Sequence, residues 1–213
     1  MIEGVLFDMD GVIVDSERFI CEAAIRMFAE LGVAMRPDDF VPFIGAGEDR
    51  YIGGPAERHG VQFDLPKAKA RTYAIYGEVI RGRLEPLPGV TAFLGKCRAR
   101  GLKTALASSA DRIKVDQNLR EIGLPESSFD AIVCGTDIVR KKPDPEIFRT
   151  AAGRLGLGPK RCLVVEDAVN GVKAARAAGA KCLGITGSFS VEQLQADWHA
   201  ADLAHAPDEC LNW

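Results

Sequence analysis

The stretch VLFDMDGVIVDS, residues 5–16, decides how the rest of the sequence is interpreted. It begins as an apolar run typical of a buried strand and then places two aspartates, Asp8 and Asp10, one residue apart. Side chains at positions i and i+2 of an extended segment point the same way, so the two carboxylates would crowd one small volume. Two charges about 5 Å apart repel by roughly 3 kcal/mol at an effective dielectric constant of about 20. We expect a shared proton, a cation or a turn of the chain to relieve this repulsion.

The composition of the 213-residue chain is typical of a globular protein, with 47% hydrophobic and 27% charged residues. A net charge of −3 and dispersed Lys and Arg residues argue against a nucleic-acid partner. The N-terminus lacks a secretion signal and no apolar stretch reaches membrane-spanning length. The six cysteines lie far apart without a CxxC pair, which predicts buried free thiols in a reducing compartment. We therefore expect a soluble cytoplasmic protein without a membrane partner.

Five short apolar runs, rich in Val, Ile, Leu, Ala and Cys, predict strands that are buried on both faces of a parallel sheet. Helix-like segments that end at glycines separate the later runs. This alternation predicts a doubly wound, Rossmann-like α/β sheet. The runs are residues 4–8, 103–108, 131–135, 161–167 and 180–186, and the helical segments are 111–122, 144–155 and 168–178.

Residues 17–82 break this alternation, because they read as several helices without a strand-like run. About 65 residues is far too long for a simple crossover between two strands. Pro and Gly residues mark the point where this segment ends. We predict an inserted α-helical cap subdomain at residues 16–85, with residues 1–15 and 86–213 forming the α/β core.

Polar side chains stand at the ends of the predicted strands, where ligands bind in a doubly wound sheet. Taken singly, each has an ordinary explanation as a helix N-cap, a turn residue or a solvated lysine. Their joint occurrence favours one site, and its facing acidic groups require a cation such as Mg²⁺, which takes carboxylate oxygens and substrate phosphate. The residues are Asp8, Asp10, Ser108, Ser109, Lys141, Lys142, Glu166 and Asp167.

Four motifs of the chain resemble those of the haloacid dehalogenase-like hydrolases, in the branch of β-phosphoglucomutase and many small-molecule phosphatases. DMDG (8–11) matches the family's DxD motif, and LASS (106–109) matches its Ser/Thr motif. KKPDPEIF (141–148) matches its lysine motif, and VVEDAVNGVKAARAAG (164–179) matches its acidic motif. The inserted helices stand where this branch carries a small helical cap.

The resemblance implies an Mg²⁺-dependent phosphatase that hydrolyses a small sugar- or polyol-phosphate-like metabolite through an aspartyl-phosphate intermediate. Asp8 is the implied nucleophile, and Asp10 the implied general acid and then base. The further implied roles cover catalysis, phosphate binding and metal binding. Ser108 and Lys142 complete the catalytic set; Met9, Asp10, Ser108, Ser109 and Lys142 bind phosphate; Asp8, Asp10 (through its backbone carbonyl), Glu166 and Asp167 bind the metal.

Three departures from the β-phosphoglucomutases favour hydrolysis over mutase activity. Ile20 stands where those enzymes carry a cap histidine, Glu48 where they carry an arginine for the second phosphate, and Asp111 where they carry a lysine. A phosphosugar mutase is the enzymatic alternative. A phospho-acceptor or binding module is the non-enzymatic alternative, although receiver domains are about half this length and lack a cap.

The cap stretch IGAGEDRYIGG (44–54) has two interpretations. Its glycines suit a specificity loop that reaches the active site, and they equally suit a plain connection between helices. Glu48, Arg50 and Tyr51 are the candidates for contacts with the leaving group. We expect a monomer or a weak homodimer that acts on a small-molecule phosphate ester.

Overall fold

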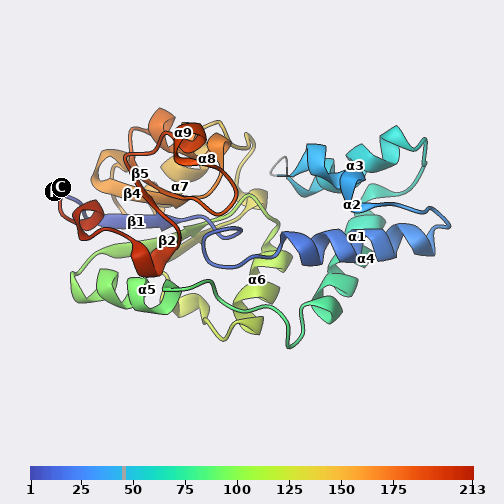
Figure 1. Cartoon of the computed structure of the whole chain (residues 1–213), viewed down its shortest axis with the longest axis horizontal. Helices are drawn as coiled ribbons and strands as arrows, with labels where there is room; N and C mark the ends of the chain where they lie inside the picture. The colour runs from blue at the N-terminus through green and yellow to red at the C-terminus, as the bar shows by residue number, and fades with distance from the viewer. Residues whose placement is uncertain (45–46) are drawn as a thin grey trace.

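A six-stranded parallel sheet forms the centre of one half of the molecule (Figure 1). The computed structural model describes residues 1–44 and 47–213. The strands follow the order β3-β2-β1-β4-β5-β6, which confirms the doubly wound α/β fold predicted from the sequence. Their bounds are β1 Gly4–Phe7, β2 Lys103–Ala107, β3 Ala131–Val133, β4 Cys162–Glu166, β5 Lys181–Ile185 and β6 Trp198–Ala200.

The strand order reverses between β1 and β4. From β1 the chain continues to β2 and β3 on one side, and β4, β5 and β6 extend the sheet on the other. Phe7 of β1 is paired with Val165 of β4, and the Asp8 N–H donates to the Val165 carbonyl at 2.9 Å. The carboxyl ends of β1 and β4 therefore lie side by side, at the place where doubly wound folds bind ligands.

Helices cover both faces of the sheet. Phe148 of α7 (Glu146–Arg154) and Val172 of α8 (Val169–Ala178) pack in the same apolar cluster as Leu6 of β1. Side chains of α5 (Val90–Ala99) and α6 (Arg112–Glu121) pack with the alternate β1 residues on the opposite face. Because both faces of the strands are covered, their sequences are continuously apolar rather than alternating.

The remaining helices form the other half of the molecule, on the right of Figure 1. One face of the first helix buries an apolar stripe with helical spacing, made of Phe19, Ile20, Ala23, Ala24, Met27 and Phe28. The aromatic rings of Phe28, Phe40 and Tyr51 follow one another at centroid distances of 6.2 and 5.3 Å. These helices are α1 Glu17–Glu30, α2 Pro37–Phe40, α3 Glu48–Arg58 and α4 Leu65–Val79.

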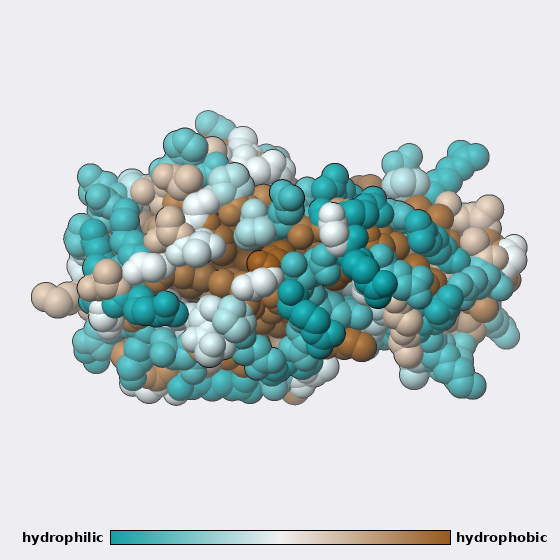
Figure 2. Space-filling view, turned by 90° about the horizontal axis from the view of Figure 1, so that it is seen from below, coloured by the Kyte–Doolittle hydropathy of each residue, from teal (hydrophilic) through white to brown (hydrophobic). Residues whose placement is uncertain are grey.

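The two connections between the sheet and this helical half run side by side. Val14 forms an antiparallel bridge with Pro86, and the Leu87 N–H donates to the Ile13 carbonyl at 2.8 Å. Figure 2 shows hydrophilic residues over much of one face of both halves, with apolar residues visible between them. The chain ends lie together at the far end of the sheet, where the Ile2 N–H donates to the Trp213 carbonyl (Figure 1).

The short elements include β6, which the sequence analysis did not predict. Its three residues, Trp-His-Ala, form no apolar run. The six cysteines are free, as predicted. None of the helices among residues 1–44 and 47–213 has the length and apolar character needed to cross a membrane. The other short elements are α9 Val191–Leu194 and the 3₁₀ helices η1 Val41–Phe43, η2 Glu126–Ser128, η3 Gly135–Asp137, η4 Pro159–Arg161, η5 Leu203–His205 and η6 Asp208–Leu211.

Candidate active site

A tight turn after β1 separates the carboxylates of Asp8 and Asp10. Gly11 has a φ of +77°, and its N–H donates to the Val14 carbonyl at 2.8 Å. A Cβ atom at this position would lie 2.1 Å from Oδ2 of Asp167, so both the backbone conformation and the close approach require glycine. The turn directs the two aspartates to different partners, which relieves the repulsion inferred from their spacing.

Three buried carboxylates from two strand ends meet on one side of this turn. Asp8, Glu166 and Asp167 each offer an oxygen atom, and these oxygens all lie within 4.8 Å of one another. The Ala168 N–H donates to Oε2 of Glu166 at 2.7 Å, and the Ser188 hydroxyl donates to Oδ2 of Asp167 at 2.8 Å. These hydrogen bonds hold the carboxylates of Glu166 and Asp167 in place.

Lys142 inserts between two of these carboxylates. Its Nζ lies 2.8 Å from Oδ1 of Asp8 and 2.5 Å from Oε1 of Glu166. Burial on its own would lower the pKa of Lys142, but the charges of Asp8 and Glu166 outweigh it and raise that pKa above its ordinary value. Lys142 is therefore a fixed cation at the bottom of the site.

The positive charge of Lys142 does not balance the negative charges of the three carboxylates. The pKa values of Asp8 and Asp167 are raised accordingly. Burial raises the pKa of Asp8 to about 8 despite Lys142, with Glu166 adding to the rise. Burial, followed by the charge of Glu166, raises the pKa of Asp167 to about 7. A group of carboxylate oxygens that holds protons near neutral pH is suited to a hard divalent cation such as Mg²⁺, which would compensate the same charge.

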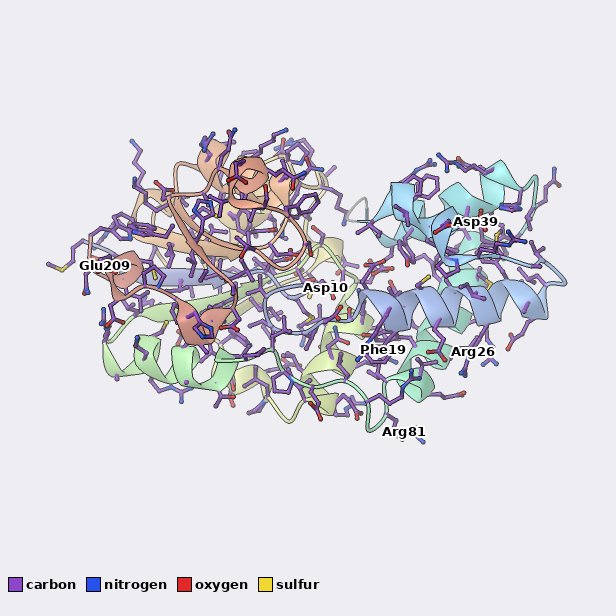
Figure 3. All side chains as sticks on the ribbon, viewed as in Figure 1. Asp10, Phe19, Arg26, Asp39, Arg81 and Glu209 are labelled. Carbon is purple, nitrogen blue, oxygen red and sulfur yellow. The ribbon has the colours of Figure 1, made fainter. Side chains whose placement is uncertain are left out.

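Asp10 is held on the other side of the turn by Ser16 and Lys114. The Ser16 hydroxyl donates to Oδ1 of Asp10, and Nζ of Lys114 lies 3.1 Å from its Oδ2. Lys114 belongs to α6, is 3% exposed, and also lies 3.6 Å from Oε1 of Glu48 on α3. This lysine therefore links Asp10 with the helical half of the molecule (Figure 3 labels Asp10 at the junction).

The phosphate-binding candidates lie around the same strand ends. The buried Ser108 hydroxyl oxygen accepts the Ala110 N–H at 3.1 Å, which leaves its own hydrogen free to donate. Ser109 Oγ is buried without a hydrogen-bond partner among the described residues and lines the cleft. Met9 turns its side chain into the core, where its Sδ accepts from Asn118, so only its backbone faces the turn.

A cleft of about 490 Å³ opens between the strand ends and the helical half. Of the cap candidates, Glu48 and Tyr51 line the cleft, because positions i and i+3 share one face of α3. Arg50 points to the outer surface and pairs with Glu57 at 2.9 Å, so the structure does not bring it to the cleft. Residues 45 and 46 of the predicted specificity loop lie outside the described residues.

Ser16, Glu17 and Lys114 also line the cleft, and none of them was predicted from the sequence. Ser16 and Glu17 stand at the start of the first helix, at the mouth of the cleft. Lys114 lies three residues, almost one helical turn, after Asp111, the residue preceding α6. A helix that starts directly behind a strand end directs its first turn toward the ligand, and this rule would have pointed to Lys114.

The comparisons with known proteins agree with this geometry. Residues 2–179 match the family model of the haloacid dehalogenase-like hydrolases. The chain is 31% identical to the phosphorylated carbohydrates phosphatase of Thermotoga maritima, over 99% of this chain and 97% of that protein. The crystal structure of CbbY from Rhodobacter sphaeroides in complex with phosphate superposes with a TM-score of 0.87 at 25% identity, covering 96% of each chain.

A further relative is much longer than this chain. The protein SUPPRESSOR OF QUENCHING 1 of Arabidopsis thaliana is 44% identical over 89% of this chain, and the match spans only 18% of that protein. The shared part is thus this hydrolase-like region. The family model, the full-length relative and the superposed structure agree with the four motifs, and the chain belongs to the haloacid dehalogenase-like hydrolases.

Proposed function

We propose that this protein is an Mg²⁺-dependent phosphatase that hydrolyses a small sugar- or polyol-phosphate through an aspartyl-phosphate at Asp8. The observation that carries the proposal is the position of the Asp8 carboxylate. It lies 2.8 Å from a buried ammonium group, within 4.8 Å of two further carboxylates, and at the wall of a cleft large enough for a small metabolite. Relatives of the chain include a phosphorylated carbohydrates phosphatase, which supports this substrate class.

In the first step, an Asp8 oxygen attacks phosphorus and the ester oxygen leaves with a proton from Asp10. Lys142, the hydroxyls of Ser108 and Ser109, and backbone N–H groups at Met9 and Asp10 hold the phosphoryl oxygens. In the second step, water attacks phosphorus, Asp10 takes its proton, and the bond between phosphorus and the Asp8 oxygen breaks. Phosphate is released and the Asp8 carboxylate is regenerated, so the groups balance over the cycle.

The carboxylates of Asp8, Glu166 and Asp167, with the backbone carbonyl of Asp10, would hold Mg²⁺. When bound, this ion supplies positive charge that offsets the charge of the phosphoryl oxygens. Asp10 itself is oriented by Ser16 and Lys114, on the side of the turn away from the three carboxylates. This separation supports its assignment to proton transfer. The cytoplasmic location and the monomer or weak homodimer stay predictions.

The test is phosphate release from p-nitrophenyl phosphate and a panel of sugar and polyol phosphates, with Mg²⁺ and after chelation. We expect Asp8→Asn to lower turnover by at least about 10³-fold, because the nucleophile is lost. Asp116→Asn removes a surface carboxylate from α6 and is the matched control. Wild-type turnover in the Asp8 variant would refute the nucleophile assignment.

The mutase alternative requires a separate measurement. A hexose 1-phosphate is supplied with a trace of the corresponding bisphosphate, and both isomer formation and free phosphate are followed. The hydrolase proposal expects free phosphate in proportion to the substrate consumed. Isomer formed without net phosphate release would replace the phosphatase by a mutase.

A further inference from the structure

The end of the cleft that faces the leaving group is rich in acidic side chains. Seven acidic side chains and two lysines line the cleft among the described residues. The acidic groups at the strand ends are accounted for by the phosphoryl and metal sites. Glu17 of α1 and Glu48 of α3 stand on the helical half, where the part of the substrate beyond the ester oxygen would lie. The seventh, Asp15, is exposed just before α1.

Both lysines that line the cleft form ion pairs with carboxylates of the protein. Lys142 contacts Asp8 and Glu166 at 2.8 and 2.5 Å. Lys114 contacts Asp10 at 3.1 Å and Glu48 at 3.6 Å, and its side chain is 4% exposed. The described part of the cleft thus offers no free cation for a second anionic group of the substrate. A buried phosphate or carboxylate without a counter-charge is strongly unfavourable.

Two other cations of the neighbourhood are also engaged elsewhere. Arg50 pairs with Glu57 on the outer surface of α3. Lys141 packs its methylene groups against Gly47, but its Nζ donates to the Gly135 carbonyl at 2.5 Å and the residue does not line the cleft. A second phosphate would therefore meet acidic groups rather than a guanidinium or ammonium group.

The same end of the cleft contains a tyrosine hydroxyl and a carboxylate oxygen without a hydrogen bond of good geometry among the described residues. Tyr51 is 5% exposed, and its hydroxyl is a neighbour of the Glu17 carboxylate and the Cys21 thiol without a hydrogen bond of good geometry among the described residues. Oε1 of Glu17 is likewise buried without such a hydrogen bond. A hydroxyl can donate to a carboxylate and accept from a tyrosine, and an ammonium group can donate to the carboxylate. The Tyr51 hydroxyl and the Glu17 carboxylate are therefore suited to hydrogen bonds with hydroxyl or amino groups of a substrate.

We propose that Glu17 and Glu48 make this end of the cleft select leaving groups that are neutral and hydroxylated, or cationic, and exclude a second phosphate or a carboxylate. This inference rests on the proposed phosphatase function and narrows its substrate class. It also predicts weak binding of a bisphosphate, which a phosphosugar mutase needs as an intermediate. Apolar side chains of Ile20 and Phe43 complete the wall and limit the water that could screen a second anion.

The test compares three esters with the same two-carbon skeleton, 2-hydroxyethyl phosphate, 2-aminoethyl phosphate and 2-phosphoglycolate, whose leaving groups end in a neutral, a cationic and an anionic group. Fructose 6-phosphate and fructose 1,6-bisphosphate form a second pair. Hydrolysis of p-nitrophenyl phosphate reports the underlying phosphatase activity. For any ester that is not hydrolysed, its affinity is measured as competitive inhibition of p-nitrophenyl phosphate hydrolysis. We expect kcat/KM or affinity at least about tenfold lower for the compounds with the additional anionic group, at low ionic strength.

The variants Glu17→Gln and Glu48→Gln test which residues carry the discrimination. Both should narrow the ratio of kcat/KM between the neutral and the anionic ester several-fold, and Glu48→Gln also removes one of the two carboxylates that neutralise Lys114. Glu57→Gln removes a carboxylate from the outer surface of α3 and should leave the ratio unchanged. The wild-type ratio alone decides the outcome if a variant fails to fold.

Equal or better processing of 2-phosphoglycolate or the bisphosphate by the wild type would overturn the selectivity while leaving the phosphatase function intact. Unchanged ratios in both folded Gln variants would remove Glu17 and Glu48 from the proposal. A protein that hydrolyses none of the esters, p-nitrophenyl phosphate included, would refute the proposed function, and this inference with it.

Discussion

Among single residues, Gly11 most directly couples the backbone to the chemistry of the site. A Cβ at Gly11 would lie 2.1 Å from Oδ2 of Asp167, at a φ of +77°. Gly11→Ala should therefore displace the Asp167 carboxylate as well as strain the turn, at about 1–2 kcal/mol for the strain alone. We expect the Mg²⁺ concentration for half-maximal turnover to rise about tenfold or more, measured by titrating Mg²⁺ against phosphate release.

Gly32 provides the control for this experiment. It has the same φ of +77°, and a Cβ there would meet no atom within 4 Å. Gly32→Ala should lower the free energy of unfolding through backbone strain and leave the Mg²⁺ dependence unchanged. If both variants show the same Mg²⁺ dependence, the approach of Gly11 to Asp167 has no part in metal binding.

Lys142 is the second residue for which we predict the kinetic effect of a substitution. Lys142→Ala leaves the buried carboxylates of Asp8 and Glu166 without their cation, and it removes the proposed partner of the phosphoryl oxygens. We expect lower kcat and higher KM together, by about 10²-fold or more in kcat/KM. Lys67→Ala, at an exposed cap position, is the control. Unchanged steady-state kinetics in the Lys142 variant would exclude it from the site.

At the scale of elements, α8 approaches the site through a glycine. Gly171 lies in the first turn of this helix, and a Cβ there would fall 1.8 Å from Oε1 of Glu166. In an open helix, replacing Gly by Ala stabilises a protein by roughly 0.5–1 kcal/mol. Gly171→Ala should instead destabilise it and lower turnover, because Glu166 would be pushed away from Lys142. Thermal unfolding and phosphate release measure the two effects.

Gly153 in α7 is the matched helical position, since a Cβ there meets no atom within 4 Å. Gly153→Ala should raise the unfolding temperature and leave turnover unaltered. Opposite signs for the two substitutions support the close packing of α8 against Glu166. A stabilised, fully active Gly171 variant would contradict it.

The elements also show why the sequence predicted most of the fold and only part of the site. Five strands have continuously apolar sequences, so their positions follow from the sequence, and this holds even for the three-residue edge strand β3. The other edge strand, β6, is equally short but lacks an apolar run. The carboxylates that end β1 and β4 were predictable because parallel strands end at one edge. Lys114 of α6 and Glu48 of α3 meet only where the helical half approaches the strand ends, which no local pattern encodes.

At the scale of the whole molecule, the helical half and the sheet share one apolar cluster. Buried residues of the helical half, such as Phe28 of α1 and Tyr76 of α4, belong to the same contiguous cluster as Phe7 of β1 and Leu119 of α6. The Tyr76 hydroxyl also donates to Oδ1 of Asn118 at 2.5 Å across the junction. Shared burial of this kind favours one cooperative unfolding transition over independent unfolding of cap and core.

The chain carries a separate optical probe for each half, which makes this cooperativity measurable. Its two tryptophans, Trp198 and Trp213, stack beside the sheet with ring centroids 6.3 Å apart. Its three tyrosines, residues 51, 73 and 76, all lie on the cap helices. We expect tryptophan fluorescence and tyrosine second-derivative absorbance to give the same urea midpoint in the wild type.

The substitution Phe28→Ala tests whether the helical half and the sheet unfold in one transition. Phe28 is fully buried in α1, and its truncation should cost about 3–5 kcal/mol through lost contacts and a cavity. If cap and core unfold together, both the tryptophan and the tyrosine curves shift to lower urea by the same amount, although Phe28 lies in the half without tryptophan. A tyrosine curve that shifts alone would show that the cap unfolds as an independent unit, because the sheet would then keep its stability without the cap packed against it.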